Sequence, residues 1–179
     1  MKIGFCGTMS VGKTTLVNAL KSLPEFKDYK FQTERSKYLR DLGIPLNTNS
    51  TIKGQTIFLA ERAAELINKN IITDRTIIDV IAFTHLAKSI SYISADKFEA
   101  YASEMIGEYD IIFYVSPKGV EIEDNGVRET DKSYRNRVDK TINNILNKYS
   151  HKIKRLIPIE GSTEERIKLV QEQISLQYL

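Results

Sequence analysis

The chain has 179 residues, of which 41% are hydrophobic and 27% are charged, so it can build one packed core and is too apolar to be a disordered chain. Its formal charge of +3 is far below the excess that a dedicated nucleic-acid binder carries. A single cysteine, Cys6, excludes an intramolecular disulfide framework, and with only two histidines the chain has too few Cys and His for a zinc site built from these residues. We therefore expect one reduced domain over residues 1–179.

The chain contains no apolar run near the roughly 18 residues that a membrane span needs. Its apolar beginning is also too short for the core of a signal peptide. We expect a cytoplasmic protein without a membrane partner.

Short apolar runs alternate with longer segments of helical periodicity, the pattern of a parallel α/β sheet. Strands are expected near 2–6, 29–33, 70–74, 110–115 and 153–159. Helices are expected near 13–22, 34–42, 52–69, 76–90, 95–107, 131–149 and 163–178. Ser94 precedes one of these helices, and Ser162 with Glu165 forms the pattern of a capping box before the last one.

The segment 116–130 has no clear period and is rich in charge and glycine. A loop of this length is unusual in a compact domain and is typical of a lid over an active site. We therefore predict a mobile lid over about 116–137.

The first apolar run leads directly into a sequence that matches the phosphate-binding pattern G-x-x-x-x-G-K-[ST]. Glycines let the backbone wrap an anion, so that successive N–H groups and the N-terminus of the next helix face phosphate oxygens. Lys13 is expected to reach the β- and γ-phosphates, and the Thr14 hydroxyl to bind Mg²⁺. The residues expected to hold the nucleotide are Gly7, Ser10, Val11, Gly12, Lys13, Thr14 and Thr15.

The rest of the chain narrows the class of nucleotide-binding protein. Neither Asn-Lys dipeptide, at Asn68 and Asn147, continues into the Asn-Lys-x-Asp pattern of a GTPase. The glycine-rich signature of transporter ATPases is absent, and the length leaves no room for the helical domain of an oligomeric AAA+ machine. A small P-loop kinase remains.

Ligands of open α/β sheets collect at the carboxyl ends of the strands, where Glu34 and the pair Asp74-Arg75 follow expected strands. Asp74 can share the Mg²⁺ with Thr14, and Arg75 can hold a substrate phosphate or hydroxyl. Glu34 can accept the proton of an attacking hydroxyl or orient it. The alternatives are a helix-capping role for Asp74, a surface role for Arg75 and a first-turn acid at Glu34. Asp110 precedes its strand, which favours a surface role.

Arginines near the expected lid are candidates for stabilising the charge that develops during phosphoryl transfer. Arg128 and Arg135 are the first choices, Arg137 is a weaker one, and ordinary helix-face cations are the alternative. Gly161, after the last strand, is placed to touch the nucleotide base with its backbone.

A cleft for the acceptor can also be sought among polar and aromatic side chains. Gln55 can read a base or an amide by paired hydrogen bonds, although an exposed glutamine is the commoner outcome. Four aromatic residues can line the cleft or fill the core, and we favour the core: Tyr38, Phe58, Phe83 and Tyr92.

Together these motifs resemble the AAA-domain family of small P-loop kinases typified by ribosylnicotinamide kinase domains. The matching segments are Gly7 to Thr15, Glu34 to Leu39, the Asp74 segment and Glu123 to Arg128. The acids after the second and third strands are also similar to those of deoxyribonucleoside kinases, while Asp74-Arg75-Thr76 is closer to thymidylate kinases. The resemblance implies a three-layer α/β P-loop fold with a five-stranded parallel sheet in the order 2-3-1-4-5.

The function expected from these residues is transfer of the ATP γ-phosphate, with Mg²⁺, to a nucleoside, a nucleotide or a related small metabolite. Two alternatives stay open: phosphorylation of a hydroxyl on a nucleic acid, and a nonenzymatic regulator whose lid is ordered by bound nucleotide. A homodimer is also left open.

Overall fold

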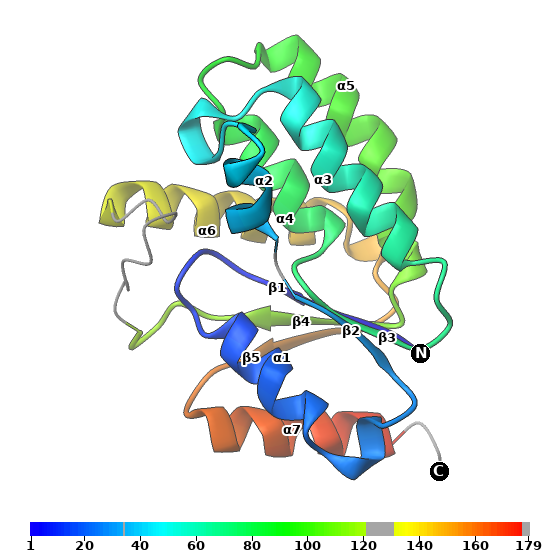
Figure 1. Cartoon of the computed structure of the whole chain (residues 1–179). Helices are drawn as coiled ribbons and strands as arrows, with labels where there is room; N and C mark the ends of the chain where they lie inside the picture. Colours follow the sequence, from blue (N-terminus) through cyan, green and yellow to red (C-terminus); the bar gives the residue numbers. More distant parts are fainter. Residues whose placement is uncertain (34, 121–130, 177–179) are drawn as a thin grey trace.

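The computed structural model describes residues 1–33, 35–120 and 131–176, and its centre is a five-stranded parallel sheet (Figure 1). The strands are β1 (Lys2–Cys6), β2 (Lys30–Gln32), β3 (Ile71–Asp74), β4 (Ile111–Val115) and β5 (Leu156–Ile159). Their order, β2-β3-β1-β4-β5, confirms the expected 2-3-1-4-5 arrangement. The carboxyl ends of β1 and β3 are neighbours, since Phe5 pairs with Asp74.

Seven α-helices are described: α1 (Lys13–Lys21), α2 (Ser36–Asp41), α3 (Ile52–Glu65), α4 (Ile77–Leu86), α5 (Tyr92–Ala102), α6 (Lys132–Lys148) and α7 (Thr163–Ser175). Short 3-10 helices are η1 (Pro24–Phe26), η2 (Asn47–Asn49), η3 (Ser103–Glu108) and η4 (Ser150–Lys152). No helix among the described residues is long and apolar enough to cross a membrane.

The helices form one layer on each face of the sheet (Figure 1). Helices α1 and α7 pack against Ile3 and Phe5 of β1 and Phe113 of β4. Helices α3 to α6 enclose the other core, to which β1 contributes Cys6 and β4 contributes Ile112. Because neighbouring strand residues point to opposite faces, the continuous apolar runs of β1 and β4 supply both cores at once.

The element boundaries differ from the expected ones where a local cap decides them. The helix expected to follow Ser94 begins three residues earlier, because the Ser91 side chain accepts a hydrogen bond from the Ser94 backbone N–H. The capping box of Ser162 and Glu165 is confirmed. The last strand begins at Leu156 rather than 153, and η4, with Ile153 as its C-cap, precedes it.

The expectation that four aromatic residues fill the core is wrong for two of them. Tyr38 is 51% exposed and Tyr92 is 76% exposed, because both stand on the outer surface of short or peripheral helices. Phe58 and Phe83 are partly buried against the core that α3 to α6 enclose. Part of the expected lid, residues 121–130, lies outside the described residues, so the lid stays a prediction.

Candidate active site

The phosphate-binding sequence forms a loop between β1 and α1 whose backbone needs glycine at its start. Gly7 has φ of 147°, and a Cβ at this position would lie 2.6 Å from the carbonyl oxygen of Val115. Ser10 and Gly12 also have positive φ, at 55° and 82°. The loop lines a small pocket, here called the phosphate pocket, whose walls are Met9, Ser10, Val11, Gly12, Lys13, Thr14, Asp74 and Arg75. Thr15 follows in the first turn of α1 and is exposed.

Lys13 is buried in the phosphate pocket, and its ammonium donates hydrogen bonds of 2.7 Å to the carbonyl oxygens of Gly7 and Thr8. Burial and then the nearby Arg75 charge lower the pKa of Lys13 to about 8, although Asp79 and Asp74 oppose the shift. A bound phosphate would give this buried ammonium a direct anionic partner.

Thr14 and Asp74 meet across the pocket as their spacing in the sequence predicted. The Thr14 hydroxyl donates to Oδ2 of Asp74, a carboxylate that is only 1% exposed. The other oxygen, Oδ1, is buried and has no hydrogen-bond partner among the described residues. A hydroxyl and a carboxylate with one unsatisfied oxygen fit Mg²⁺, which prefers oxygen ligands.

Arg75 follows Asp74 in a backbone conformation that non-glycine residues rarely adopt, with φ of 101°. Its backbone N–H donates to the Phe5 carbonyl at 3.0 Å. Its guanidinium lies 5.0 Å from the centre of the Phe83 ring and 4.0 Å from Oδ1 of Asp79. Such strain costs about 1–3 kcal/mol and is most often kept at functional sites.

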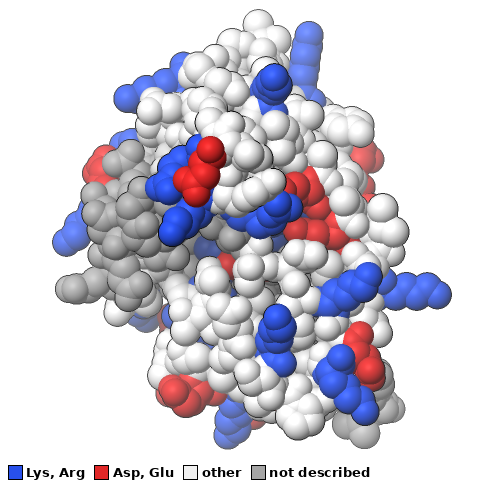
Figure 2. All heavy atoms as spheres, viewed as in Figure 1, with Lys and Arg blue, Asp and Glu red and all other residues white. Residues whose placement is uncertain are grey.

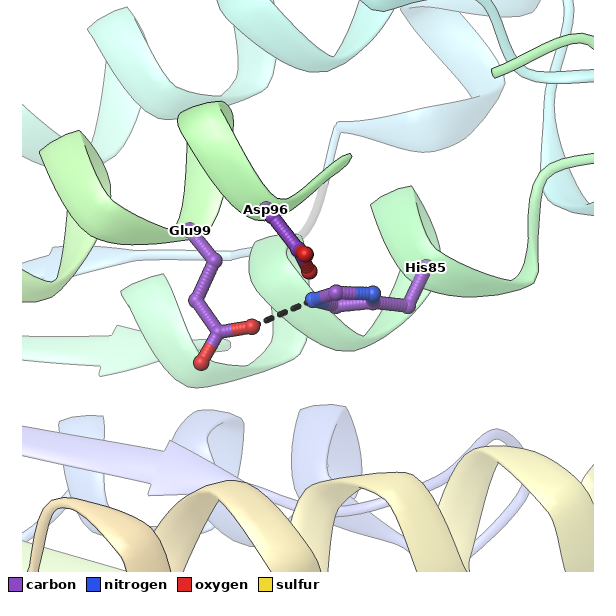
Figure 3. A group of neighbouring side chains, drawn as sticks. All are labelled: His85, Asp96 and Glu99. Atoms are coloured by element: carbon purple, nitrogen blue, oxygen red, sulfur yellow. Dashed lines mark hydrogen bonds and ion pairs between the residues drawn. The ribbon is translucent and has the colours of Figure 1, made fainter. Parts of the chain in front are cut away.

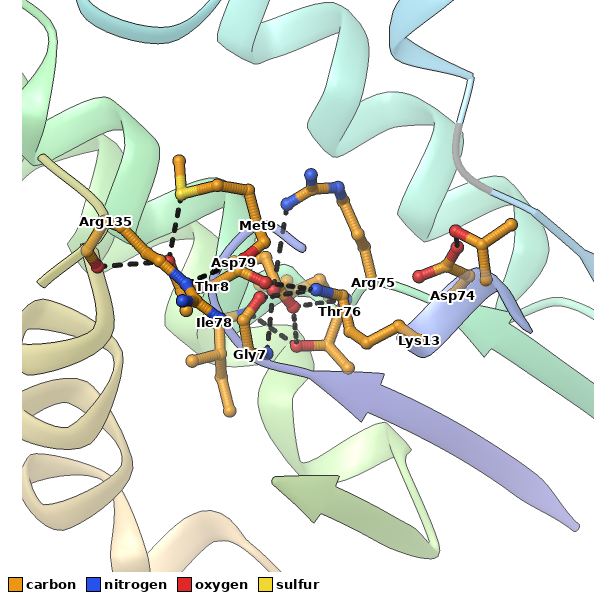
Figure 4. A network of polar contacts seen from close by, with 12 residues as sticks. Gly7, Thr8, Met9, Lys13, Asp74, Arg75, Thr76, Ile78, Asp79 and Arg135 are labelled. Carbon is orange, nitrogen blue, oxygen red and sulfur yellow. Dashed lines mark hydrogen bonds and ion pairs between the residues drawn. The ribbon is translucent and has the colours of Figure 1, made fainter. Parts of the chain in front are cut away.

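Asp79, which the sequence interpretation missed, joins α4 to the phosphate loop (Figure 4). One of its carboxylate oxygens accepts from the Gly7 N–H at 3.1 Å. The other accepts from the backbone N–H and hydroxyl of Thr76, completing the capping box of α4. The pattern Thr-x-x-Asp before an apolar run was the sequence signal that could have revealed it.

Two arginines bind the carbonyl groups of the loop that Lys13 does not contact. Arg135 of α6 donates to the carbonyls of Met9 and Ser10, each at 3.2 Å, and to that of Val120 at 2.7 Å. Arg166 of α7 donates to the Val11 carbonyl at 2.5 Å. Three successive loop carbonyls therefore each face a buried guanidinium.

The structure thus places Arg135 behind the loop, bonded to carbonyls, in the state described. Arg166 was not a candidate from the sequence. The one sequence feature that could have drawn attention to it is its place near the start of α7, where the helix dipole disfavours a cation.

For three other expected site residues, the described contacts show no link to the phosphate pocket. Glu34 and Arg128 lie outside the described residues. Gly161 has φ of 95°, a conformation that glycine adopts far more easily than other residues, so the turn into α7 by itself favours glycine. Asp110 accepts from the Lys2 backbone N–H and from Lys154 at the opposite strand end, which agrees with a structural role.

A second pocket, here called the aromatic pocket, lies between α3, α4 and the segment that joins α2 to α3. Its lining is Ser36, Leu46, Asn47, Ser50, Gln55, Phe58, Arg75, Asp79, Val80 and Phe83. Gln55 is only 3% exposed. The exposed glutamine that is the commoner outcome on a helix is therefore not what the structure shows. Arg75 belongs to the walls of both pockets, which therefore adjoin.

Comparison with protein families decides the family: a model described as AAA domain matches residues 2–166. The chain belongs to this AAA-domain family. No curated protein matches it. Among solved structures, deoxyadenosine kinase from M. mycoides with bound dCTP has 18% identity and a TM-score of 0.64, covering 98% of this chain and 99% of that chain.

The same enzyme appears in two further complexes with similar scores. With bound dATP it has 17% identity and a TM-score of 0.64, covering 98% of this chain and 100% of that chain. With products dCMP and a flexible dCDP it has 16% identity and a TM-score of 0.63, covering 98% of each. At these identities the likeness establishes a shared fold.

Replacing Arg166 tests whether the outer hydrogen bonds hold the loop in a phosphate-binding shape. In Arg166→Met the Val11 carbonyl loses its donor, which costs about 1–3 kcal/mol when the carbonyl is buried. We predict ATP binding weaker by about tenfold or more, measured by calorimetry on folded protein. Arg155→Met is the control, since the Arg155 guanidinium donates to Gln173, away from the loop. Unchanged affinity in Arg166→Met would contradict this role.

The lowered pKa of Lys13 predicts how ATP binding responds to pH. The charged ammonium is the form that attracts phosphate, and it is lost as the pH rises through about 8. The dissociation constant for ATP should therefore rise about tenfold per pH unit above 8. Lys13→Met should bind weakly at every pH, with a flat profile over the same range. A flat profile in the native chain would show that Lys13 does not titrate there.

Proposed function

We propose that this protein transfers the γ-phosphate of ATP, with Mg²⁺, to a hydroxyl of a nucleoside or a related small molecule with a flat amide-bearing or base-like group. One observation carries the proposal: the phosphate pocket adjoins a pocket lined by a buried amide and two aromatic rings, and Arg75 lies on the wall of both. The fold shared with deoxyadenosine kinase supports it.

The donor would lie along the phosphate loop. Its phosphates would accept from loop N–H groups and from the ammonium of Lys13, which would leave the carbonyls of Gly7 and Thr8. Thr14 and Asp74 would hold Mg²⁺, which neutralises charge on the phosphates when it is bound. Arg135 and Arg166 would keep the loop in place from behind.

The acceptor would occupy the aromatic pocket. The Gln55 amide can pair with a base or a carboxamide, because it offers a donor and an acceptor side by side. Phe58 and Phe83 supply apolar contact to a flat ring. Ser36, two residues after Glu34, lines the same pocket, so the chain bearing this proposed base passes its wall.

In the proposed step, the acceptor oxygen forms a bond to the γ-phosphorus while the bond between that phosphorus and the bridging oxygen of ADP breaks. The hydroxyl proton passes to Glu34, which lies outside the described residues and remains our candidate base. Arg75 stands between the pockets, where its guanidinium can stabilise the charge on the transferred group. Arg128 stays a candidate for the same task.

A nucleic-acid hydroxyl as acceptor receives less support. On the described part of the face in Figure 2, lysines and arginines lie in separate groups with acidic residues among them, rather than along one continuous track. An extended polyanion is usually held by such a track.

The deciding experiment is mass spectrometry of products after incubation with ATP, Mg²⁺ and a panel of nucleosides, nucleotides, ribosylnicotinamide and single-stranded DNA. We predict phosphorylation of at least one small acceptor. With that acceptor, Gln55→Leu should raise its KM about tenfold, the effect of one lost hydrogen-bond pair, and leave the KM for ATP unchanged. Thr56→Ala, on the exposed side of α3, is the matched control.

If only the DNA gained phosphate, the proposal would be wrong and the protein would be a nucleic-acid kinase. ATP binding without turnover on any acceptor would favour the nonenzymatic regulator.

A further inference from the structure

Away from the two pockets, α4 and α5 bring together three side chains that commonly bind transition metals (Figure 3). His85 is in the last turn of α4, and Asp96 and Glu99 are one turn apart on α5. One ligand atom from each residue lies within 4.8 Å of the others. His85 follows Asp79 by six residues, about 9 Å along the axis of α4, so the group is separate from the phosphate loop.

Glu99 is held as a ligating carboxylate usually is. It is 5% exposed, and its Oε1 accepts from the Tyr149 hydroxyl at 2.8 Å and from the Lys148 ammonium at 2.7 Å. Its Oε2 faces Nε2 of His85 at 2.5 Å. Burial raises the pKa of Glu99, but the hydrogen bonds from Lys148, Tyr149 and His85 outweigh it and lower the pKa, so the carboxylate is charged at neutral pH.

The charges of the group favour a cation. Asp96 and Glu99 place two carboxylates three residues apart on one helix, an arrangement in which like charges repel. Lys148 offsets one charge through its ion pair with Glu99. With a neutral imidazole, the three ligands and Lys148 carry a net charge of about −1, which a divalent ion would reverse.

We propose that His85, Asp96 and Glu99 form a binding site for a divalent transition metal of the Zn²⁺ type. An imidazole nitrogen with two carboxylate oxygens suits Zn²⁺ better than Mg²⁺, which prefers oxygen ligands only. Asp96 is exposed, so the ion can enter from solvent and keep water as a further ligand. The small number of Cys and His residues argued against a zinc site built from Cys and His alone. In this site two carboxylates provide the remaining ligands beside one histidine.

The metal would join α4 to α5 and, through the bonds of Glu99, to the end of α6. When Zn²⁺ binds, Nε2 of His85 and Oε2 of Glu99 exchange their mutual hydrogen bond for bonds to the ion, and the Nε2 proton moves to Nδ1 or to solvent. We expect an ion that stabilises this helical layer and takes no part in phosphoryl transfer.

The test uses the full chain, first freed of transition metals and then kept in excess Mg²⁺ so that the Thr14–Asp74 site is occupied. Zn²⁺ or Co²⁺ is the probe. We expect Zn²⁺ to raise the melting temperature, and Co²⁺ to show the visible d–d absorption bands of an ion bound by the protein. Asp96→Asn should abolish both effects, and because Asp96 is exposed this variant is expected to fold. His85→Ala should do the same. Tyr149→Phe should weaken Zn²⁺ binding by about 10–100-fold.

Two variants control for metal bound elsewhere. His151→Ala removes the other histidine and Asp28→Asn an exposed carboxylate, and both should bind Zn²⁺ as the native chain does. Equal Zn²⁺ affinity in Asp96→Asn and the native chain would overturn the proposal. Absence of a melting shift and of Co²⁺ bands in the native chain would overturn it as well.

Discussion

The carbonyl groups of the phosphate loop depend on donors from several parts of the chain. Lys13 bonds those of Gly7 and Thr8, and those of Met9, Ser10 and Val11 need donors from outside the loop. Buried carbonyls without donors would each cost about 1–3 kcal/mol, enough to unsettle a loop with positive φ at three positions. Arg135 and Arg166 supply those donors from α6 and α7. Both helices that follow β4 are therefore fixed relative to the loop by the same requirement.

A second contact reaches the loop from α4. The carboxylate of Asp79 holds the N–H of Gly7 and the first turn of α4 together, and α4 also forms a wall of the aromatic pocket. Arg75 lies between them in a strained conformation. The proposed donor and acceptor sites thus share one rigid element, so a substrate in one pocket is positioned against a phosphate in the other.

The sequence predicted the features that depend on local pattern. The loop from Gly7 to Thr15 and the meeting of Thr14 with Asp74 follow from the phosphate-binding motif and from the rule that ligands collect at strand ends. The strand order was implied by the resemblance to small P-loop kinases. Distant partners that belong to no motif were not predicted. Arg166 bonds to the Val11 carbonyl across 155 residues, and no sequence pattern near Arg166 indicates that contact. Exposure of Tyr38 and Tyr92 was missed because composition does not reveal which aromatic residues a short helix turns outward.

In the proposed reaction the phosphate pocket and the aromatic pocket act as one active site, with Arg75 on the wall of both. This arrangement can be measured through the affinity of a bisubstrate ligand in which adenosine is joined through a phosphate chain to the preferred acceptor. If the pockets adjoin as one site, this ligand should bind about 100-fold or more tightly than either half alone, and Arg75→Met should remove most of the gain. A linked ligand that binds no better than its tighter half would show that the two pockets do not act as one site.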